Sequence, residues 1–144
     1  MKILLTGANG YIGMRLLPQL LELGHEIICA VRDEKRLSVD ALTRSKIEVV
    51  EVDFLEDVEN TEIPSDIDAA YYLIHSMTTS IGDFDEKEAL AAQNFNSLLS
   101  KTNVKQVIYL SGIVNDKKLS KHLSSRKNVE DILYQGSFDV TVLR

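Results

Sequence analysis

Apolar residues along the chain follow two different spacings. Short runs rich in apolar residues predict six strands, and the run at residues 25–31 is nearly continuous, of the kind that a parallel sheet buries on both faces. Between them, longer segments in which apolar residues recur every three or four positions predict helices. The predicted strands span residues 2–6, 25–31, 47–52, 69–74, 107–110 and 140–143, and the predicted helices span residues 12–23, 39–44, 84–101 and 119–134.

This alternation of strands and helices predicts an α/β fold. We expect a Rossmann-type doubly wound parallel β-sheet with right-handed crossovers, flanked by helices in three α/β/α layers. Gly24 is expected to end the first helix and Ser38 to cap the start of the second. The acidic segment 55–68 is either a short helix or irregular. With 144 residues, 44% of them hydrophobic, the chain can build the core of one domain over residues 1–144.

The turn between the first strand and the first helix carries three glycines, in the string Thr6-Gly7-Ala8-Asn9-Gly10-Tyr11-Ile12-Gly13. Glycines at this spacing let the backbone bend sharply, approach a bulky anion and bring the new helix close to the sheet. The first N–H groups of that helix then point at a phosphate, which the helix dipole also favours. We therefore predict that this turn binds the pyrophosphate of a dinucleotide. An ordinary strand–turn–helix without a ligand is the alternative.

Charge and cysteine content argue against several other classes of protein. The net charge of −6 disfavours a nucleic-acid partner, because phosphate backbones are bound by an excess of Lys and Arg. The single cysteine, Cys29, allows no internal disulfide and lies in an apolar run, where we expect it to be buried. The histidines and Cys29 lack the spacing of metal ligands, so no metal site is predicted. No apolar run has membrane-spanning length, and we expect a cytoplasmic protein without a membrane partner.

The ends of the second and third strands bear on which dinucleotide is bound. In such folds an acidic residue after the second strand bonds the ribose hydroxyls of NAD, whereas an arginine accommodates the 2′-phosphate of NADP. The sequence has both, and Arg32 comes before Asp33. A guanidinium suits a phosphate dianion, so we expect NADP in preference to NAD, with NAD as the alternative. Asp53, after the third strand, would lie at the adenine or serve as a turn-former.

Two further strings complete the pattern, Val107-Ile108-Tyr109-Leu110-Ser111-Gly112 and the closing Asp139-Val140-Thr141-Val142-Leu143-Arg144. Together with the glycine turn, Arg32 and Asp53-Phe54, they resemble the short-chain dehydrogenase/reductase superfamily. The nearest likeness is to its extended and atypical branches, the sugar-nucleotide-epimerase-like and NmrA-like proteins. The resemblance covers essentially the whole chain. It implies an N-terminal NAD(P)-binding Rossmann domain, which we expect to be truncated before a C-terminal substrate-binding portion.

The resemblance implies roles for individual residues. Ser111 would polarise a substrate carbonyl, and His75 would lie along the nicotinamide ribose. Asn94 looks like the helix asparagine of such enzymes, or it is a polar residue on a half-exposed helix. The residues implied to hold the cofactor are Thr6, Gly7, Asn9, Gly10, Tyr11, Ile12, Gly13, Arg32, Asp53, Phe54 and His75.

The catalytic pair departs from the family's pattern. The family's Tyr-x-x-x-Lys places a lysine one helical turn from the tyrosine, which lowers the pKa of the phenol so that it can pass a proton. Glu130 resembles the glutamate that follows this tyrosine by eight residues, and counting back from it puts the pair at His122 and Arg126. A guanidinium disfavours imidazolium and leaves a neutral imidazole that can exchange a proton near neutral pH. An exposed helix pair without a catalytic role is the alternative.

Two functions from different classes fit these residues. The first is an NAD(P)-dependent oxidoreductase or epimerase-like enzyme that acts on an unknown small molecule, with the cofactor supplying hydride transfer. The second is a non-catalytic NADP-binding redox sensor or regulator of the NmrA-like kind, favoured by the loss of the tyrosine. A nucleotide-sugar binder without redox turnover is a third. The sequence leaves the substrate and the oligomeric state open, a homodimer being one option.

Overall fold

The computed structural model describes residues 1–75, 84–112 and 121–144, without the side chains of residues 84 and 121–123. The strands of the described residues are β1 (Lys2–Thr6), β2 (Glu26–Val31), β3 (Ile47–Glu51), β4 (Ala69–Tyr72), β5 (Gln106–Leu110) and β6 (Asp139–Leu143). The helices are α1 (Tyr11–Glu22), α2 (Ala41–Arg44), α3 (Phe84–Leu99) and α4 (Lys121–Leu133), with a 3₁₀ turn, η1, at Glu34–Arg36.

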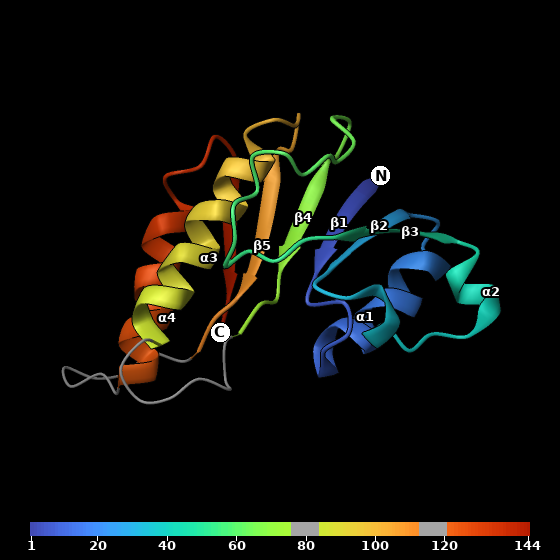
Figure 1. Ribbon diagram of the computed structural model, residues 1–144, viewed down its shortest axis with the longest axis horizontal. Helices are drawn as coiled ribbons and strands as arrows, with labels where there is room; N and C mark the ends of the chain where they lie inside the picture. Colours follow the sequence, from blue (N-terminus) through green and yellow to red (C-terminus); the bar gives the residue numbers. More distant parts are fainter. Residues whose placement is uncertain (76–83, 113–120) are drawn as a thin grey trace.

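All the strands are parallel and lie in the order β3-β2-β1-β4-β5-β6. β1 is central, because Leu4 is in register with Ile28 of β2 on one side and with Ala70 of β4 on the other. The strand order therefore reverses between β1 and β4, and a doubly wound sheet opens a crevice at such a point, outside the carboxyl ends of the strands. β1, β4 and β5 all end at the lower edge of the sheet in Figure 1. The predicted Rossmann-type fold is confirmed.

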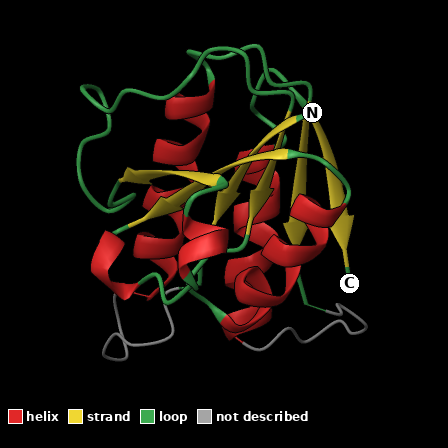
Figure 2. Ribbon diagram, turned by 90° about the vertical axis from the view of Figure 1, so that its right-hand side faces the viewer, coloured by secondary structure: helices red, strands yellow, loops and turns green. Residues whose placement is uncertain are grey.

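Helices cover both faces of the sheet, because successive side chains of a strand point to opposite faces. On one face Leu4 of β1 shares a buried cluster with Phe95 of α3. On the other face Leu5 packs with Leu17 of α1. Figure 2 shows the strands fanning out between these helices. Cys29 lies in the cluster beneath α1, as predicted, and its burial raises the pKa of the thiol to about 11, so the thiol stays protonated.

The helix caps agree with the sequence in one case and differ in another. Gly24 follows α1 with a φ of +78°, the left-handed conformation that ends a helix. α2 is shorter than predicted, and its cap is not Ser38 but Asp40, whose carboxylate accepts hydrogen bonds from the N–H (2.9 Å) and the hydroxyl (2.7 Å) of Thr43. The carboxylate two residues later takes the capping position, so the helix begins later. Segment 55–68 is irregular.

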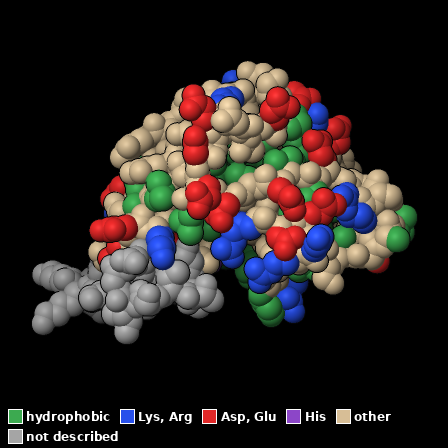
Figure 3. Space-filling model, in the orientation of Figure 1, with side chains coloured by type: hydrophobic (Ala, Val, Ile, Leu, Met, Phe, Trp, Pro, Cys, Tyr) green, Lys and Arg blue, Asp and Glu red, His purple; other side chains and the backbone are tan. Residues whose placement is uncertain are grey.

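The surface carries charges of both signs. On the coloured part of the face shown in Figure 3, acidic and basic side chains are interspersed. Across the described ranges of the chain, none of the helices has both the length and the apolar character needed to cross a membrane.

Candidate functional site

A cavity of about 340 Å³ opens at the carboxyl edge of the sheet. Its wall is formed by the glycine turn, by the residues at the ends of β2, β3, β4 and β5, and by Ala91 of α3. These elements surround the point where the strand order reverses, so the topology and the cavity indicate the same place. Every residue predicted to hold the cofactor lines this cavity except Thr6.

The glycine turn accepts no larger residue at two of its positions. Gly7 has a φ of +65°, and a Cβ atom there would lie 2.7 Å from the carbonyl oxygen of Leu73. A Cβ atom on Gly13 would lie 2.3 Å from the carbonyl oxygen of Gly7. The turn is thus pressed against the segment after β4, and α1 is pressed against the turn. Gly10 precedes α1 without a side-chain cap, and the first residues of the helix, Tyr11, Ile12 and Gly13, line the cavity. The first amide groups of a helix without such a cap are available to an anion.

Thr6 lies beneath the cavity rather than in its wall. The residue is fully buried at the end of β1. Its hydroxyl donates a hydrogen bond to the carbonyl oxygen of Tyr71 (2.8 Å) and accepts one from the N–H of Leu73 (3.1 Å). Thr6 therefore joins the ends of β1 and β4, the two strands between which the cavity opens.

At the end of β2, the acidic side chains are engaged and the arginine is not. The carboxylate of Asp33 caps η1 by accepting a hydrogen bond from the N–H of Lys35 (2.9 Å). Glu34 forms an ion pair with Arg44. Arg32 lines the cavity, is exposed, and forms no ion pair with any residue that the structure describes. Its guanidinium is therefore free to meet an anion from the cavity.

The loop after β3 is held in place from α3. Asp53 makes a local turn, its carboxylate accepting a hydrogen bond from the N–H of Leu55 (3.0 Å). The side-chain amide of Asn94 donates to the carbonyl oxygens of Phe54 (2.8 Å) and Glu56 (2.9 Å). Two bonds from one helical side chain fix the loop that forms one wall of the cavity.

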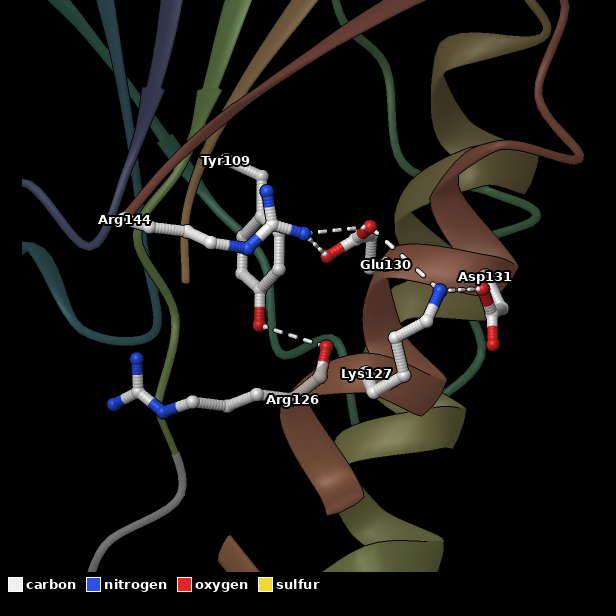
Figure 4. Close-up of polar contacts among 6 residues, drawn as sticks. All are labelled: Tyr109, Arg126, Lys127, Glu130, Asp131 and Arg144. Carbon is white, nitrogen blue, oxygen red and sulfur yellow. Dashed lines mark hydrogen bonds and ion pairs between the residues drawn. The ribbon is translucent and has the colours of Figure 1, made fainter. Parts of the chain in front are cut away.

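Beyond β4, His75 lines the cavity as a neutral imidazole. Its burial and the nearby charge of Arg126 lower the pKa of His75 to about 4. Arg126 lies on α4, where its backbone carbonyl accepts a hydrogen bond from the hydroxyl of Tyr109 (3.3 Å), as Figure 4 shows. The structure thus relates His75 to Arg126, a pairing that the sequence did not predict.

The other predicted catalytic residues lie around this end of the sheet. Ser111 follows β5 and is 7% exposed; its N–H donates to the carbonyl oxygen of Leu143 (2.8 Å), and its hydroxyl lies near the hydroxyl of Tyr109, whose pKa burial raises and this hydroxyl lowers in part. The backbone of His122 begins α4, and its side chain lies outside the described part of the structure.

Several residues of the site were not predicted from the sequence. Val52, Leu73, Ala91 and Leu110 line the cavity. Three of them stand at or after the ends of strands, so the rule that ligands bind beyond the carboxyl ends would have found them. Ala91 lies on α3 without such a signal. In the described ranges, no three His, Cys, Asp or Glu side chains gather as a metal site.

The chain was compared with known proteins. A family model described as NAD(P)H-binding matches residues 7–144. No curated protein matches the sequence. Solved structures with the same fold include a Bacillus halodurans protein assigned as an NAD-dependent epimerase/dehydratase, with 23% identity and a TM-score of 0.77. The match covers 100% of this chain and 69% of that protein.

Two further solved structures are similar over the whole of this chain. The Bordetella bronchiseptica enzyme WbmG, in complex with NAD, has 18% identity and a TM-score of 0.74, with 52% of its length covered. UDP-N-acetylglucosamine 4-epimerase from Bacillus cereus has 22% identity and a TM-score of 0.74, with 58% covered. The chain thus spans little more than half the length of these two enzymes. At such identities the likeness is one of fold.

Proposed function

This chain belongs to the NAD(P)H-binding family, and from that premise we propose that its cavity binds NADP(H) in preference to NAD(H). We propose further that residues 1–144 are the cofactor-binding part of an oxidoreductase or epimerase that acts on a small molecule. The observation that carries the proposal is the glycine turn, whose backbone packs against the segment after β4 and whose helix begins without a side-chain cap. Dinucleotides bind with their pyrophosphate at such a glycine turn and helix N-terminus, at the point where the strand order reverses.

The residues present fit such a cofactor. The amide groups of Tyr11, Ile12 and Gly13 would hold the pyrophosphate, since they are the first of α1 and line the cavity. The adenine would lie against Phe54, whose ring is fixed by an edge contact with Phe95 at 5.9 Å between ring centroids. The apolar side chains around it exclude water from the base.

The preference for NADP(H) is supported by the balance of charges after β2. Arg32 is exposed to the cavity without an ion pair among the described residues, whereas Asp33 is used as a cap and Glu34 is paired with Arg44. A guanidinium binds a phosphate dianion through two parallel N–H bonds, and a carboxylate in its place would repel it. Asp33 retains a second carboxylate oxygen for a ribose hydroxyl, which keeps NAD(H) as a weaker ligand.

Binding measurements test this preference. Isothermal titration of the protein with NADPH and NADH is expected to show tighter binding of NADPH. Arg32→Gln is expected to weaken NADPH about tenfold or more, corresponding to about 1.4 kcal/mol, and NADH much less. Lys46→Gln removes the same charge just before β3, at the amino ends of the strands and away from the cavity, and serves as the control. Equal weakening of both cofactors by Arg32→Gln would remove Arg32 from the 2′-phosphate site.

In the reaction we propose, the bound cofactor supplies or accepts a hydride. The hydroxyl of Ser111, at the end of β5, would donate a hydrogen bond to a substrate carbonyl and polarise it. His122 would exchange a proton with the substrate oxygen, with Arg126 one helical turn away favouring its neutral form. These three roles are proposals from the residues at the corresponding positions of the family.

A sensor or regulator that binds NADPH without turnover is the second candidate. It is favoured by one observation, the replacement of the tyrosine–lysine pair by His122 and Arg126. The absorbance of NADPH, followed over a broad panel of carbonyl compounds, separates the candidates. Tight binding without any loss of absorbance supports the sensor, whereas turnover that His122→Ala abolishes supports the enzyme.

A further inference from the structure

Arg126 occupies a position that the cofactor site does not explain. It lies half-buried on α4, with its backbone carbonyl fixed to β5 by the hydroxyl of Tyr109 (3.3 Å). In Figure 4 its side chain extends away from the ionic cluster of Lys127, Glu130 and Asp131, toward the segment that follows β4. The guanidinium is thus directed to the end of the sheet where His75 stands.

No carboxylate of the described residues forms an ion pair with this guanidinium. Glu130, one turn along α4, accepts hydrogen bonds from Arg144 on both of its oxygens (2.8 and 3.0 Å) and lies 3.7 Å from Nζ of Lys127. Asp131 is paired with Lys127. A half-buried cation without a counter-ion is unfavourable, so this arrangement is stabilised when an anion binds.

A buried hydroxyl next to Arg126 in the sequence also lacks a partner among the described residues. The hydroxyl of Ser125, the neighbour of Arg126 on α4, is buried without a hydrogen bond within the described part of the chain. The charge of Arg126 acts on His75, a residue of the cavity wall, and contributes to lowering its pKa. Buried polar groups are normally satisfied, so a polar ligand group is expected here.

The cofactor's own phosphates are accounted for elsewhere. The pyrophosphate site lies at the end of β1, and Arg32 follows β2, whereas Tyr109, which holds Arg126, belongs to β5. β1 and β2 lie on the opposite side of β4 from β5. The anion that Arg126 can bind is therefore not one of those phosphates.

We propose that Arg126 binds an anionic group of the substrate, a carboxylate or a phosphate, beside the reacting end of the cofactor. A guanidinium holds either group through two parallel N–H bonds, and Ser111, which follows β5, would be a further donor beside the cofactor. The substrates are then anionic small molecules. This inference rests on the proposed NADP(H) site and adds the class of substrate to it.

Matched pairs of probes test the inference without requiring turnover. The full-length protein, saturated with NADPH, is titrated calorimetrically with levulinate and methyl levulinate, and with glucose 6-phosphate and glucose. We expect one anionic probe to bind about tenfold or more tightly than its neutral partner, and the pair that responds distinguishes carboxylate from phosphate. Arg126→Gln is expected to remove this preference. Lys127→Gln removes the same charge from the next residue of α4, whose side chain points to Asp131, and is expected to retain it.

The affinity for NADPH is measured first in each protein. An unchanged affinity together with a lost preference in Arg126→Gln supports the inference. Three results would overturn the inference and leave the proposed cofactor site standing. They are a fall in NADPH affinity in Arg126→Gln, a preference for the anion that survives in this variant, and a wild-type protein that binds neither anion better than its neutral partner. If Arg126→Gln does not fold, Arg126→Lys is used, which keeps the charge but not the fork and is expected to lose part of the preference. A wild-type protein that binds no NADPH refutes the proposed function itself.

Discussion

At the scale of single residues, the surroundings of His75 set its protonation state and therefore which hydrogen bonds this part of the cavity wall can make. Burial disfavours the charged imidazolium, and the guanidinium of Arg126 disfavours it further, so the pKa of His75 falls to about 4. At neutral pH the ring is therefore uncharged, with one nitrogen that donates and one that accepts a hydrogen bond. A neutral ring suits ribose hydroxyls, which need both.

The protonation of His75 can be measured directly. In wild-type protein the NMR signal of its ring is expected to stay in the neutral form from pH 7 down to about 5, because the pKa lies well below the ordinary value near 6.5. As the pH falls from about 6.5 to about 4, the unfolded chain takes up this proton before the folded protein does, so His75 reduces stability over that range. Arg126→Gln is expected to raise the midpoint and Lys127→Gln to leave it unchanged. A wild-type midpoint near 6.5 would contradict this account.

At the scale of elements, the loop after β3 depends on α3 for its position. No regular structure holds residues 53–56, and the two hydrogen bonds from Asn94 to Phe54 and Glu56 take that role. Phe54 also packs against Phe95, the next residue of α3. The helix therefore sets the shape of a cavity wall to which it contributes Ala91 itself.

Replacing the amide of Asn94 tests this dependence. Asn94→Asp keeps the shape of the side chain but sets a carboxylate against two carbonyl oxygens, so the loop is expected to move. We expect NADPH to bind about tenfold more weakly, the loss of about 1.4 kcal/mol that one or two hydrogen bonds supply. Gln93→Glu, which introduces the same charge at the exposed neighbouring position, is the control. Binding as tight in Asn94→Asp as in the control would show that the loop holds its shape without these bonds.

The elements and the position of the site could be predicted from the sequence, whereas most of the side-chain contacts could not. The strand-end rule indicated Arg32 and Asp53, and the family resemblance indicated His75. All three line the cavity, because in a parallel sheet the ends of strands meet at one edge. The bonds of Asn94 and the pairing of Glu130 with Arg144 join residues far apart in the sequence, and no local spacing encodes such contacts. Thr6 belonged to the motif, yet its hydroxyl is used between two strands, which only the register shows.

At the scale of the whole molecule, the edge strand β6 is tied to the helical layer by one ionic contact. Glu130 is 5% exposed on α4 and accepts two hydrogen bonds from Arg144, which follows β6. In the part of the sheet that the structure describes, β6 pairs with β5 alone. The contact therefore gives β6 a second attachment besides its pairing with β5.

Two neighbouring carboxylates allow a matched test of this support. Glu130→Ala leaves a polar partner unpaired beside a buried position, and we expect it to lower the free energy of unfolding by about 2 kcal/mol. Asp131→Ala removes the same charge from a surface pair with Lys127, where a loss under about 0.5 kcal/mol is expected. Urea denaturation of both variants gives the comparison. Similar losses in the two variants would show that the buried contact contributes no more than a surface pair.

The central place of β1 has a consequence for how the molecule assembles. β1 meets β2 through residues 24 positions apart, Leu4 and Ile28, but meets β4 through Leu4 and Ala70, 66 positions apart. Distant pairings close larger loops and form late, so the first βαβ unit is expected to exist before β4 docks beside it. The crevice is created by that late docking. A nucleotide at a hundred times its dissociation constant binds only the finished fold and would then raise the free energy of unfolding by about 2.7 kcal/mol. The ligand would thus also stabilise the docking of β4 that creates its binding site.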